Sequence, residues 1–212
     1  GKFKHEIIPV EGKFPDGTTK VVDYDQDVRP DSSLEKIRSL PSIYKQDGTV
    51  TAASSSKQSD GAAAAVFMPK EKARELGLVP MATVRSMAWS ACDPKIMGYS
   101  ATLASKKAVE RAGLTPADMD LWESNAAFAS PPLTQTKVMG IDPQKMNVNG
   151  DALCIGHPIG ASGIRMVGTL AHEMNRRGSR YGCGAICGGF GQGTAMVIER
   201  EEYWDGHRAW LS

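Results

Sequence analysis

From residue 62 to residue 199, segments with the apolar pattern of β-strands alternate with segments that have the pattern of helices. A chain that alternates in this way is expected to form a layered α/β domain, because the faces of the sheet need helices to cover them. The expected strands are residues 62–68, 81–91, 120–125, 181–187 and 193–199, and the expected helices are residues 69–76, 100–114, 128–138 and 160–177. We therefore predict a mixed five-stranded sheet with helices.

The connections between these segments support the prediction. Glycine lies at the end of two expected helices, at Gly77 and Gly113, where it favours helix termination. The last two expected strands are joined only by CGGFGQG, residues 187–193. This linker is too short for a helical crossover, so the two strands are expected to pair antiparallel.

Residues 1–60 have a different character, being polar and rich in turn-forming residues. A short helical pattern occurs only near residues 33–40, and the segment lacks the apolar periodicity of a self-sufficient core. We expect it to be an elaborated loop region that lies on another part of the protein. The predicted division is residues 1–60 as the loop region, residues 61–200 as the main domain and residues 201–212 as a tail.

Composition narrows the classes of protein. The chain has 212 residues, of which 41% are hydrophobic and 23% charged, so it is expected to fold. A net charge of +1, from 25 basic and 24 acidic residues, gives no electrostatic argument for binding nucleic acid or an anionic membrane. No apolar run approaches about 18 residues and the N-terminus lacks a secretory core, so we expect no membrane span and no secretion. Four cysteines without a second pair at zinc spacing indicate free thiols in a reducing, cytoplasmic compartment and no metal site.

The segment GHPIGASG, residues 156–163, places His157 at the expected start of a helix. Pro158 suits the first helical position because the missing N–H of proline costs nothing there. The positive end of the helix dipole disfavours imidazolium, so His157 is expected to stay neutral and to act as a base or hydrogen-bond donor. The competing interpretation is a capping histidine in a glycine-rich turn.

The segment CGGFGQG begins with Cys187 at the end of an expected strand. Its glycines leave backbone N–H groups unshielded, as an oxyanion hole requires. A thiol whose ordinary pKa is about 8.5 can act as an acid or a base when a neighbour tunes it. The competing interpretation is a glycine-rich turn beside a buried cysteine.

The segment WESNAAFA, residues 122–129, places Asn125 at the end of another expected strand. In α/β domains, side chains at this position often point into the functional site. An amide can hold a water or a carbonyl group without titrating. The competing interpretation is that Asn125 caps the helix that follows.

In this order, the three segments resemble the thiolase family. NVNGDALCIGHPIGASGIR (residues 147–165) and CGGFGQG are close to the family's two C-terminal signatures, and WESNAAFA looks like its NEAFA motif. The resemblance covers residues 1 to about 200. It implies a thiolase-like layered α/β fold that comprises the C-terminal domain and part of the loop domain.

The resemblance implies a role for each matching residue. His157 would activate the nucleophilic cysteine, and Cys187 would remove the α-proton of acetyl-CoA in condensation and return it in cleavage. Asn125, through a water, and His157 would bind the thioester oxygen, and the N–H of Gly189 would contribute to a second oxyanion hole. The implied substrate contacts are Ser56 on the pantetheine arm of CoA, Arg29 near the CoA nucleotide, and Met97 and Phe128 along the acyl pocket.

The nucleophilic cysteine of the family is missing from the pattern, because none of the four cysteines matches its position. We therefore expect one subunit of a split thiolase, with the nucleophile on a partner chain that carries the N-terminal half, assembled as a heterotetramer or larger. CoA would be a substrate, and no bound cofactor is expected. The alternative is a non-catalytic CoA-binding or scaffolding subunit that is thiolase-like in sequence.

Several positions depart from the family pattern. Ala126 replaces the acidic residue of NEAF, Asp151 replaces a small residue, and Phe190 stands in a run that is usually all glycine. These changes favour an unusual acyl group, such as a bulky or branched 3-oxoacyl-CoA. The aromatic tail, residues 201–212, is expected either to dock on a partner chain or to fold back on its own domain.

Overall fold

The computed structural model describes residues 2–201, and the chain divides into two compact units, residues 1–41 and 42–212. The first unit contains an antiparallel hairpin of β1 (Val10–Lys13) and β2 (Thr19–Val22), followed by the short helix α1 (Leu34–Arg38). The side chain of Ser33 caps α1 by accepting a hydrogen bond from the Lys36 N–H at 3.1 Å. The expected helical stretch is confirmed. The hairpin was not expected, because its mostly exposed strands do not alternate between apolar and polar residues.

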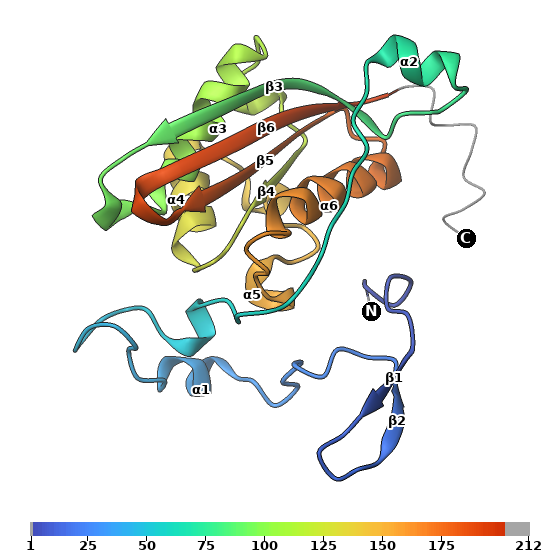
Figure 1. The fold of residues 1–212 in the computed structure, drawn as a ribbon. Helices are drawn as coiled ribbons and strands as arrows, with labels where there is room; N and C mark the ends of the chain where they lie inside the picture. The colour runs from blue at the N-terminus through green and yellow to red at the C-terminus, as the bar shows by residue number, and fades with distance from the viewer. Residues whose placement is uncertain (1, 202–212) are drawn as a thin grey trace. The chain divides into compact units, whose positions relative to one another are not determined.

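The second unit is built on a mixed sheet of β3 (Ala82–Ala91), β4 (Leu121–Ser124), β5 (Tyr181–Gly188) and β6 (Gln192–Arg200) (Figure 1). The strand order is β3-β6-β5-β4. β6 pairs antiparallel with both β3 and β5, whereas β4 pairs parallel with β5. The mixed sheet and the antiparallel pairing of the last two strands are therefore confirmed.

The prediction of a fifth strand at residues 62–68 was wrong. Within the described residues this sheet has four strands, and residues 62–68 form neither a strand nor a helix. Val66 is 83% exposed and Phe67 is 58% exposed. The segment has the composition of a buried strand, but a strand also needs a neighbour to pair with, and none lies beside it in the described part of the chain.

Helices cover both faces of this sheet (Figure 1). α3 (Tyr99–Arg111) packs against β3, β5 and β6, and α6 (Ser162–Arg177) packs against β4, β5 and β6. α4 (Ser130–Met139) packs on α3, and α2 (Lys70–Glu75) precedes the sheet. All four expected helices are present within a few residues of their predicted bounds. α5 (Ala152–Ile155) forms where a loop was expected, and single helical turns occur at residues 52–54, 94–96, 116–118, 143–145 and 189–191.

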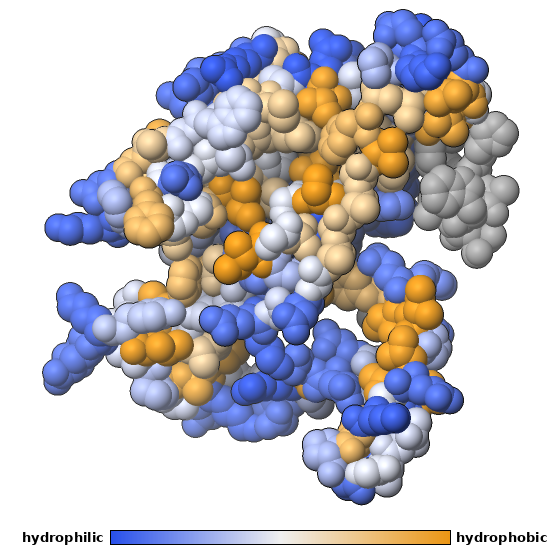
Figure 2. All heavy atoms as spheres, viewed as in Figure 1, coloured by the Kyte–Doolittle hydropathy of each residue, from blue (hydrophilic) through white to orange (hydrophobic). Residues whose placement is uncertain are grey.

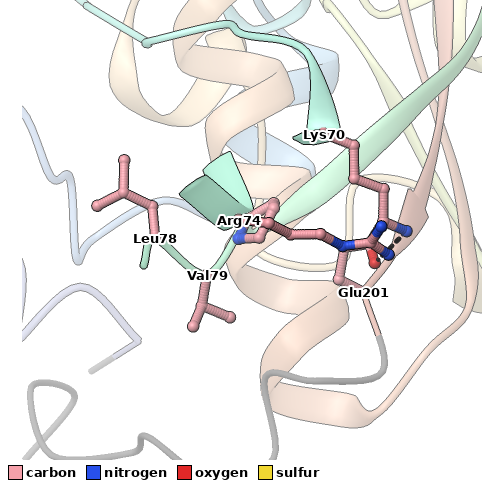
Figure 3. A pocket seen from close by; sticks show the side chains of 6 residues that line it. Lys70, Arg74, Leu78, Val79 and Glu201 are labelled. Atoms are coloured by element: carbon pink, nitrogen blue, oxygen red, sulfur yellow. Dashed lines mark hydrogen bonds and ion pairs between the residues drawn. The ribbon is translucent and has the colours of Figure 1, made fainter. Parts of the chain in front are cut away.

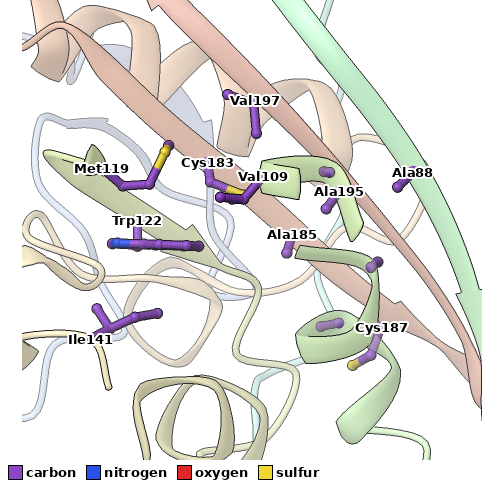
Figure 4. Close-up of a cluster of buried hydrophobic side chains, with 13 residues drawn as sticks. Ala88, Val109, Met119, Trp122, Ile141, Cys183, Ala185, Cys187, Ala195 and Val197 are labelled. Carbon is purple, nitrogen blue, oxygen red and sulfur yellow. The ribbon is translucent and has the colours of Figure 1, made fainter. Parts of the chain in front are cut away.

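Alternating residues of the strands enter two separate cores. Trp122 and Val197 belong to the core under α3, which Figure 4 shows, and Leu121 and Ile198 belong to the core under α6. Close packing of α6 depends on glycine in β5. A Cβ atom at Gly182 would lie 2.5 Å from Met174 Sδ and 3.0 Å from the Leu170 side chain. Glycine at this position thus lets α6 pack closely against the sheet.

A cavity of about 250 Å³ lies beside α2, away from the residues expected at the site (Figure 3). It is lined by Lys70, Arg74, Leu78, Val79, Pro80 and Glu201. Lys70 Nζ forms an ion pair with Glu201 at 2.8 Å across one side. In residues 2–201, no helix has the length and apolar character to cross a membrane, and metal-ligating side chains do not cluster in groups of three or more.

Candidate active site

Asn125 lies directly after β4, at the edge of the sheet. Its N–H donates to the carbonyl of Ala185 on β5 at 2.9 Å, so the parallel pairing of the two strands extends to this residue. The side chain is 1% exposed, and its Nδ2 lies 3.4 Å from His157 Nε2. Its Oδ1 is buried and has no hydrogen-bond partner among the described residues. Because leaving such an oxygen unpaired costs roughly 1–3 kcal/mol, the position is suited to a donor from a ligand.

His157 is fixed by its backbone and by one ring nitrogen. Its N–H donates to the carbonyl of Lys57 at 3.0 Å, and its Nδ1 lies 2.7 Å from Ser162 Oγ. The Ser162 hydroxyl has one proton, which it donates to the carbonyl of Pro158 at 3.0 Å. In this arrangement Ser162 accepts from Nδ1–H, and the lone pair is assigned to Nε2, where the NH₂ group of Asn125 can donate to it. Nε2 is the nitrogen that faces Asn125, so a base is aimed at the site.

The prediction that Pro158 occupies the first helical position was wrong. α6 begins at Ser162, and the carbonyl of Pro158 accepts from the N–H groups of Ala161 and Ser162, both at 2.9 Å. A hydrogen-bonded turn thus separates His157 from the helix. The pKa of His157 is lowered mainly by burial and then by the positive charge of Arg165. The neutral form of His157 is favoured as expected, but the causes are burial and the charge of Arg165, not the helix dipole.

Cys187 lies near the end of β5, on the face that α3 covers, and is 7% exposed (Figure 4). Burial raises the pKa of its thiol, and the nearby Cys92 thiol raises it further. The N–H of Asn125 is hydrogen-bonded to Ala185, two residues before Cys187. Because β4 and β5 run parallel, Asn125 and Cys187 lie at the same, carboxyl-terminal end of the two strands. At neutral pH Cys187 is therefore a protonated thiol that can donate its proton.

The glycine-rich turn after Cys187 is open. A Cβ atom at Gly189 would meet no atom within 4 Å. Phe190 has φ +62°, in the left-handed region that favours glycine, and is 88% exposed. Gly191, by contrast, lies so close to the carbonyl of Cys92 that a Cβ atom there would be 2.1 Å from the oxygen. The turn is thus fixed at Gly191 and accessible at Gly189.

A second loop lies along the site. The N–H of Ser56 donates to the carbonyl of Ala127 at 2.9 Å, and Gln58 forms a bridge with His157. Phe128 pairs with Ser55 in a further bridge, and its ring meets Tyr44 edge-on at 6.1 Å. The structure thus brings Ser56 and Phe128 close to the segments that carry Asn125 and His157.

The two remaining predicted residues lie in different places. Met97 packs against the core that contains Cys187. Arg29 is exposed and belongs to the compact unit of residues 1–41, so the fold of the second unit does not bring it to the site.

Comparison with known proteins identifies the family. Residues 1–71 match the family model for the thiolase N-terminal domain, and residues 78–200 match the model for the thiolase C-terminal domain. The chain belongs to the thiolase family. It is 46% identical over 204 residues to the 3-ketoacyl-CoA thiolase of Marinobacter nauticus and 48% identical to that of Cronobacter sakazakii. These alignments cover 94% of this chain but 52% and 53% of the relatives, so the chain spans about half the length of the curated thiolases it matches.

Solved thiolase structures share the fold. An acetyl-CoA acetyltransferase of Bacillus anthracis superposes with a TM-score of 0.86 at 38% identity, covering 95% of this chain and 51% of that one. Human mitochondrial 3-ketoacyl-CoA thiolase superposes with a TM-score of 0.80 at 36% identity, covering 91% of this chain and 49% of that one. The same human enzyme in complex with CoA is also similar, with a TM-score of 0.77. The layered thiolase fold expected from the sequence is confirmed.

Several residues that shape this candidate site were not found by sequence reasoning. Ser162 orients the His157 ring, Arg165 lowers its pKa, and Asn147 holds the backbone before Asn125. Ser162 had a usable signal, a hydroxyl at the start of a helix just after the histidine. Asn147 had none, because its partner lies 23 residues earlier in the chain.

Proposed function

We propose that this chain supplies the acid/base half of a thiolase site. The enzyme cleaves a 3-oxoacyl-CoA with CoA to give acetyl-CoA and a shortened acyl-CoA, or runs the reverse Claisen condensation. The observation that carries the proposal is the Asn125–His157 pair, in which the unprotonated Nε2 and the buried amide of Asn125 face each other. A base and a hydrogen-bond donor at one point are what thioester chemistry at a carbonyl requires.

His157 and Cys187 each act in two steps. His157 Nε2 takes the proton of the nucleophilic thiol and then donates it in a hydrogen bond to the thioester oxygen, together with Asn125 acting through a water. The Cys187 thiol gives its proton to the α-carbon of the departing acetyl-CoA enolate. The thiolate so formed takes a proton from the incoming CoA thiol, which restores Cys187. The open backbone at Gly189 is suited to binding the second oxyanion, because no side chain shields it.

We further propose that the nucleophilic cysteine comes from a partner chain with the N-terminal thiolase half, in a heterotetramer or larger assembly. Among residues 2–201, no hydrogen bond joins a cysteine to His157, and the hydrogen-bond partner of Nε2 is the Asn125 amide. Large apolar side chains near the site are exposed, including Phe190 at 88% and Ile159 at 83%, and Figure 2 shows hydrophobic residues at the surface. Residues 62–68, of which 62–67 are exposed, lie within the match to the N-terminal domain. Apolar surface of this kind is suited to burial by a partner.

The remaining assignments belong to the same proposal. Residues 1–60 are part of the loop domain and residues 61–200 form the C-terminal domain, while the tail after Glu201 lies outside the described residues. Ser56 and Arg29 contact CoA, and Met97 and Phe128 line the acyl pocket. The reaction serves fatty-acid β-oxidation in the cytoplasm and needs no bound cofactor.

The test is thiolysis of acetoacetyl-CoA by this chain, alone and assembled with an N-terminal thiolase half that carries the nucleophile. We expect turnover only in the assembly, and a loss of at least about 100-fold in the His157→Gln variant, since removing one such group costs about 3 kcal/mol. Full activity of the chain alone would rule out the partner. Unchanged turnover in the Cys187→Ala assembly would instead favour a scaffolding subunit.

A further inference from the structure

The outer edge of β4 has no neighbouring strand in the described part of the chain; instead it is held by an isolated parallel bridge between Trp122 and Met146 and by the side chain of Asn147. Its Oδ1 accepts from the Ser124 N–H at 2.7 Å, and its Nδ2 donates to the Ser124 carbonyl at 2.9 Å. Its own N–H donates to the carbonyl of Trp122 at 2.8 Å. These bonds hold the backbone of the residue that directly precedes Asn125.

Asp151 joins Asn147 to the segment that carries His157. Its Oδ2 accepts from Asn147 Nδ2 at 2.6 Å, and its Oδ1 accepts from the Leu153 N–H at 2.9 Å, which caps the start of α5. α5 ends after Ile155, Gly156 turns the chain with φ +88°, and His157 follows. Hydrogen bonds to a carboxylate are shorter and about twice as strong as those between neutral groups.

One carboxylate therefore connects the backbone before Asn125 to the helix before His157. The two side chains that it connects meet at 3.4 Å, a distance at the limit of a hydrogen bond, so small movements of either segment change the contact.

We propose that Asp151 is a positioning residue, which acts through Asn147 to hold Asn125 and His157 at their working separation. The inference rests on the proposed thiolase function, because it assigns Asn125 and His157 to one oxyanion. Within the described residues, Asp151 is not hydrogen-bonded to the side chain of Asn125 or of His157. Its effect is therefore expected in the turnover rate more than in substrate binding.

The Asp151→Asn variant tests the hydrogen bond to Asn147 separately from the hydrogen bond to Leu153. Asparagine keeps an oxygen for the Leu153 N–H, so the cap of α5 remains, but its NH₂ group cannot accept from Asn147. Asp142→Ala is the matched control, since Asp142 also caps a short helical turn through the Gln144 N–H at 2.9 Å but is exposed. In the assembled enzyme we expect Asp151→Asn to lower kcat about 10-fold or more, with KM within about twofold, because small misplacements of catalytic groups are costly. The control should keep the wild-type kcat.

Two further measurements make the test specific. Because Asp151 acts through Asn147, the double variant Asp151→Asn/Asn147→Ala should lose little more kcat than Asn147→Ala alone. In the full chain without a partner, ¹⁵N-histidine NMR should show His157 with its proton on Nδ1, and Asp151→Asn should weaken that preference whereas Asp142→Ala should not. The His157→Gln variant assigns the signal.

Each outcome decides one question. A kcat for Asp151→Asn equal to that of the control, or losses that multiply in the double variant, would overturn the positioning role. An assembly that lacks thiolysis while the His157 signal still responds to Asp151→Asn would refute the proposed function and leave the positioning role standing. An unresponsive signal in an active assembly whose kcat is also unchanged would refute the positioning role alone.

Discussion

Glu123 makes the stability of this fold depend on pH. It lies in β4, two residues before Asn125, and is 4% exposed. Burial raises the pKa of its carboxyl group from 4.5 to about 8; the charge of Arg165 opposes the change, and the charges of Asp151 and Glu173 add to it. The folded chain therefore binds this proton between pH 4.5 and about 8, whereas the unfolded chain releases it. Since the folded state binds more protons in this window, its stability falls as pH rises.

The size of the effect follows from the pKa. Each pH unit inside the window costs the folded state about 1.4 kcal/mol, so stability falls by roughly 3 kcal/mol between pH 5.5 and pH 7.5. Glu123→Gln removes the ionisable group and keeps the shape of the side chain. Relative to the wild type, the variant should gain about that much stability over the same pH range.

Urea unfolding of the full chain at pH 5.5, 6.5, 7.5 and 8.5 measures the gain. Glu75→Gln is the control, because Glu75 forms an exposed ion pair with Lys72 on α2 and such pairs contribute about 0–1 kcal/mol. Its effect should stay the same at all four pH values. A difference between Glu123→Gln and the wild type that stays constant from pH 5.5 to 8.5 would refute the reasoning.

Three further predictions follow from the structure. Burial and Arg165 lower the pKa of His157, so the acidic limb of the kcat/KM profile of the assembled enzyme should lie below pH 6.5, and Arg165→Met should move it upward. Gly182→Ala should destabilise the chain by about 1–3 kcal/mol in urea unfolding, because its Cβ would lie 2.5 Å from Met174 Sδ. Gly184→Ala, whose nearest contact would be 3.4 Å, should cost less than about 1 kcal/mol, and equal losses would contradict the packing argument. Phe190→Gly should leave thermal stability unchanged or raise it by up to about 1 kcal/mol, because glycine adopts φ +62° without strain and the ring is 88% exposed. A loss of stability would show that the ring is packed.

The sequence predicted those elements whose pattern is local. α3 and α6 each present an apolar face, and β5 and β6 are separated by a linker too short for anything but an antiparallel turn. The prediction of a strand at residues 62–68 was wrong because strand formation depends on a neighbouring strand, and no pattern within the segment reveals whether one is present. α5 was missed because a helix of four residues is too short to show periodicity, and its start depends on the Asp151 side chain.

The candidate site divides in the same way. His157, Cys187 and Asn125 could be named because each stands in a motif at the end of an expected element. Their arrangement could not be predicted, because the contact between Asn125 and His157 joins segments 32 residues apart and depends on the parallel pairing of β4 with β5. The tautomer of His157 depends on where Ser162 sends its single proton, and that is fixed only once the turn after Pro158 has formed.

The structure also changes what the histidine motif means. A capping histidine would use its ring to satisfy the N–H groups at the start of α6. Instead, Nδ1 donates to Ser162, and Nε2 faces the Asn125 amide, whose nitrogen lies 3.4 Å away and whose oxygen has no hydrogen-bond partner among residues 2–201. A buried amide and a half-buried imidazole held this way contribute little to the stability of the chain itself. Their arrangement is explained by a reactant that uses both, which is why the pair, more than any single motif, points to thioester chemistry.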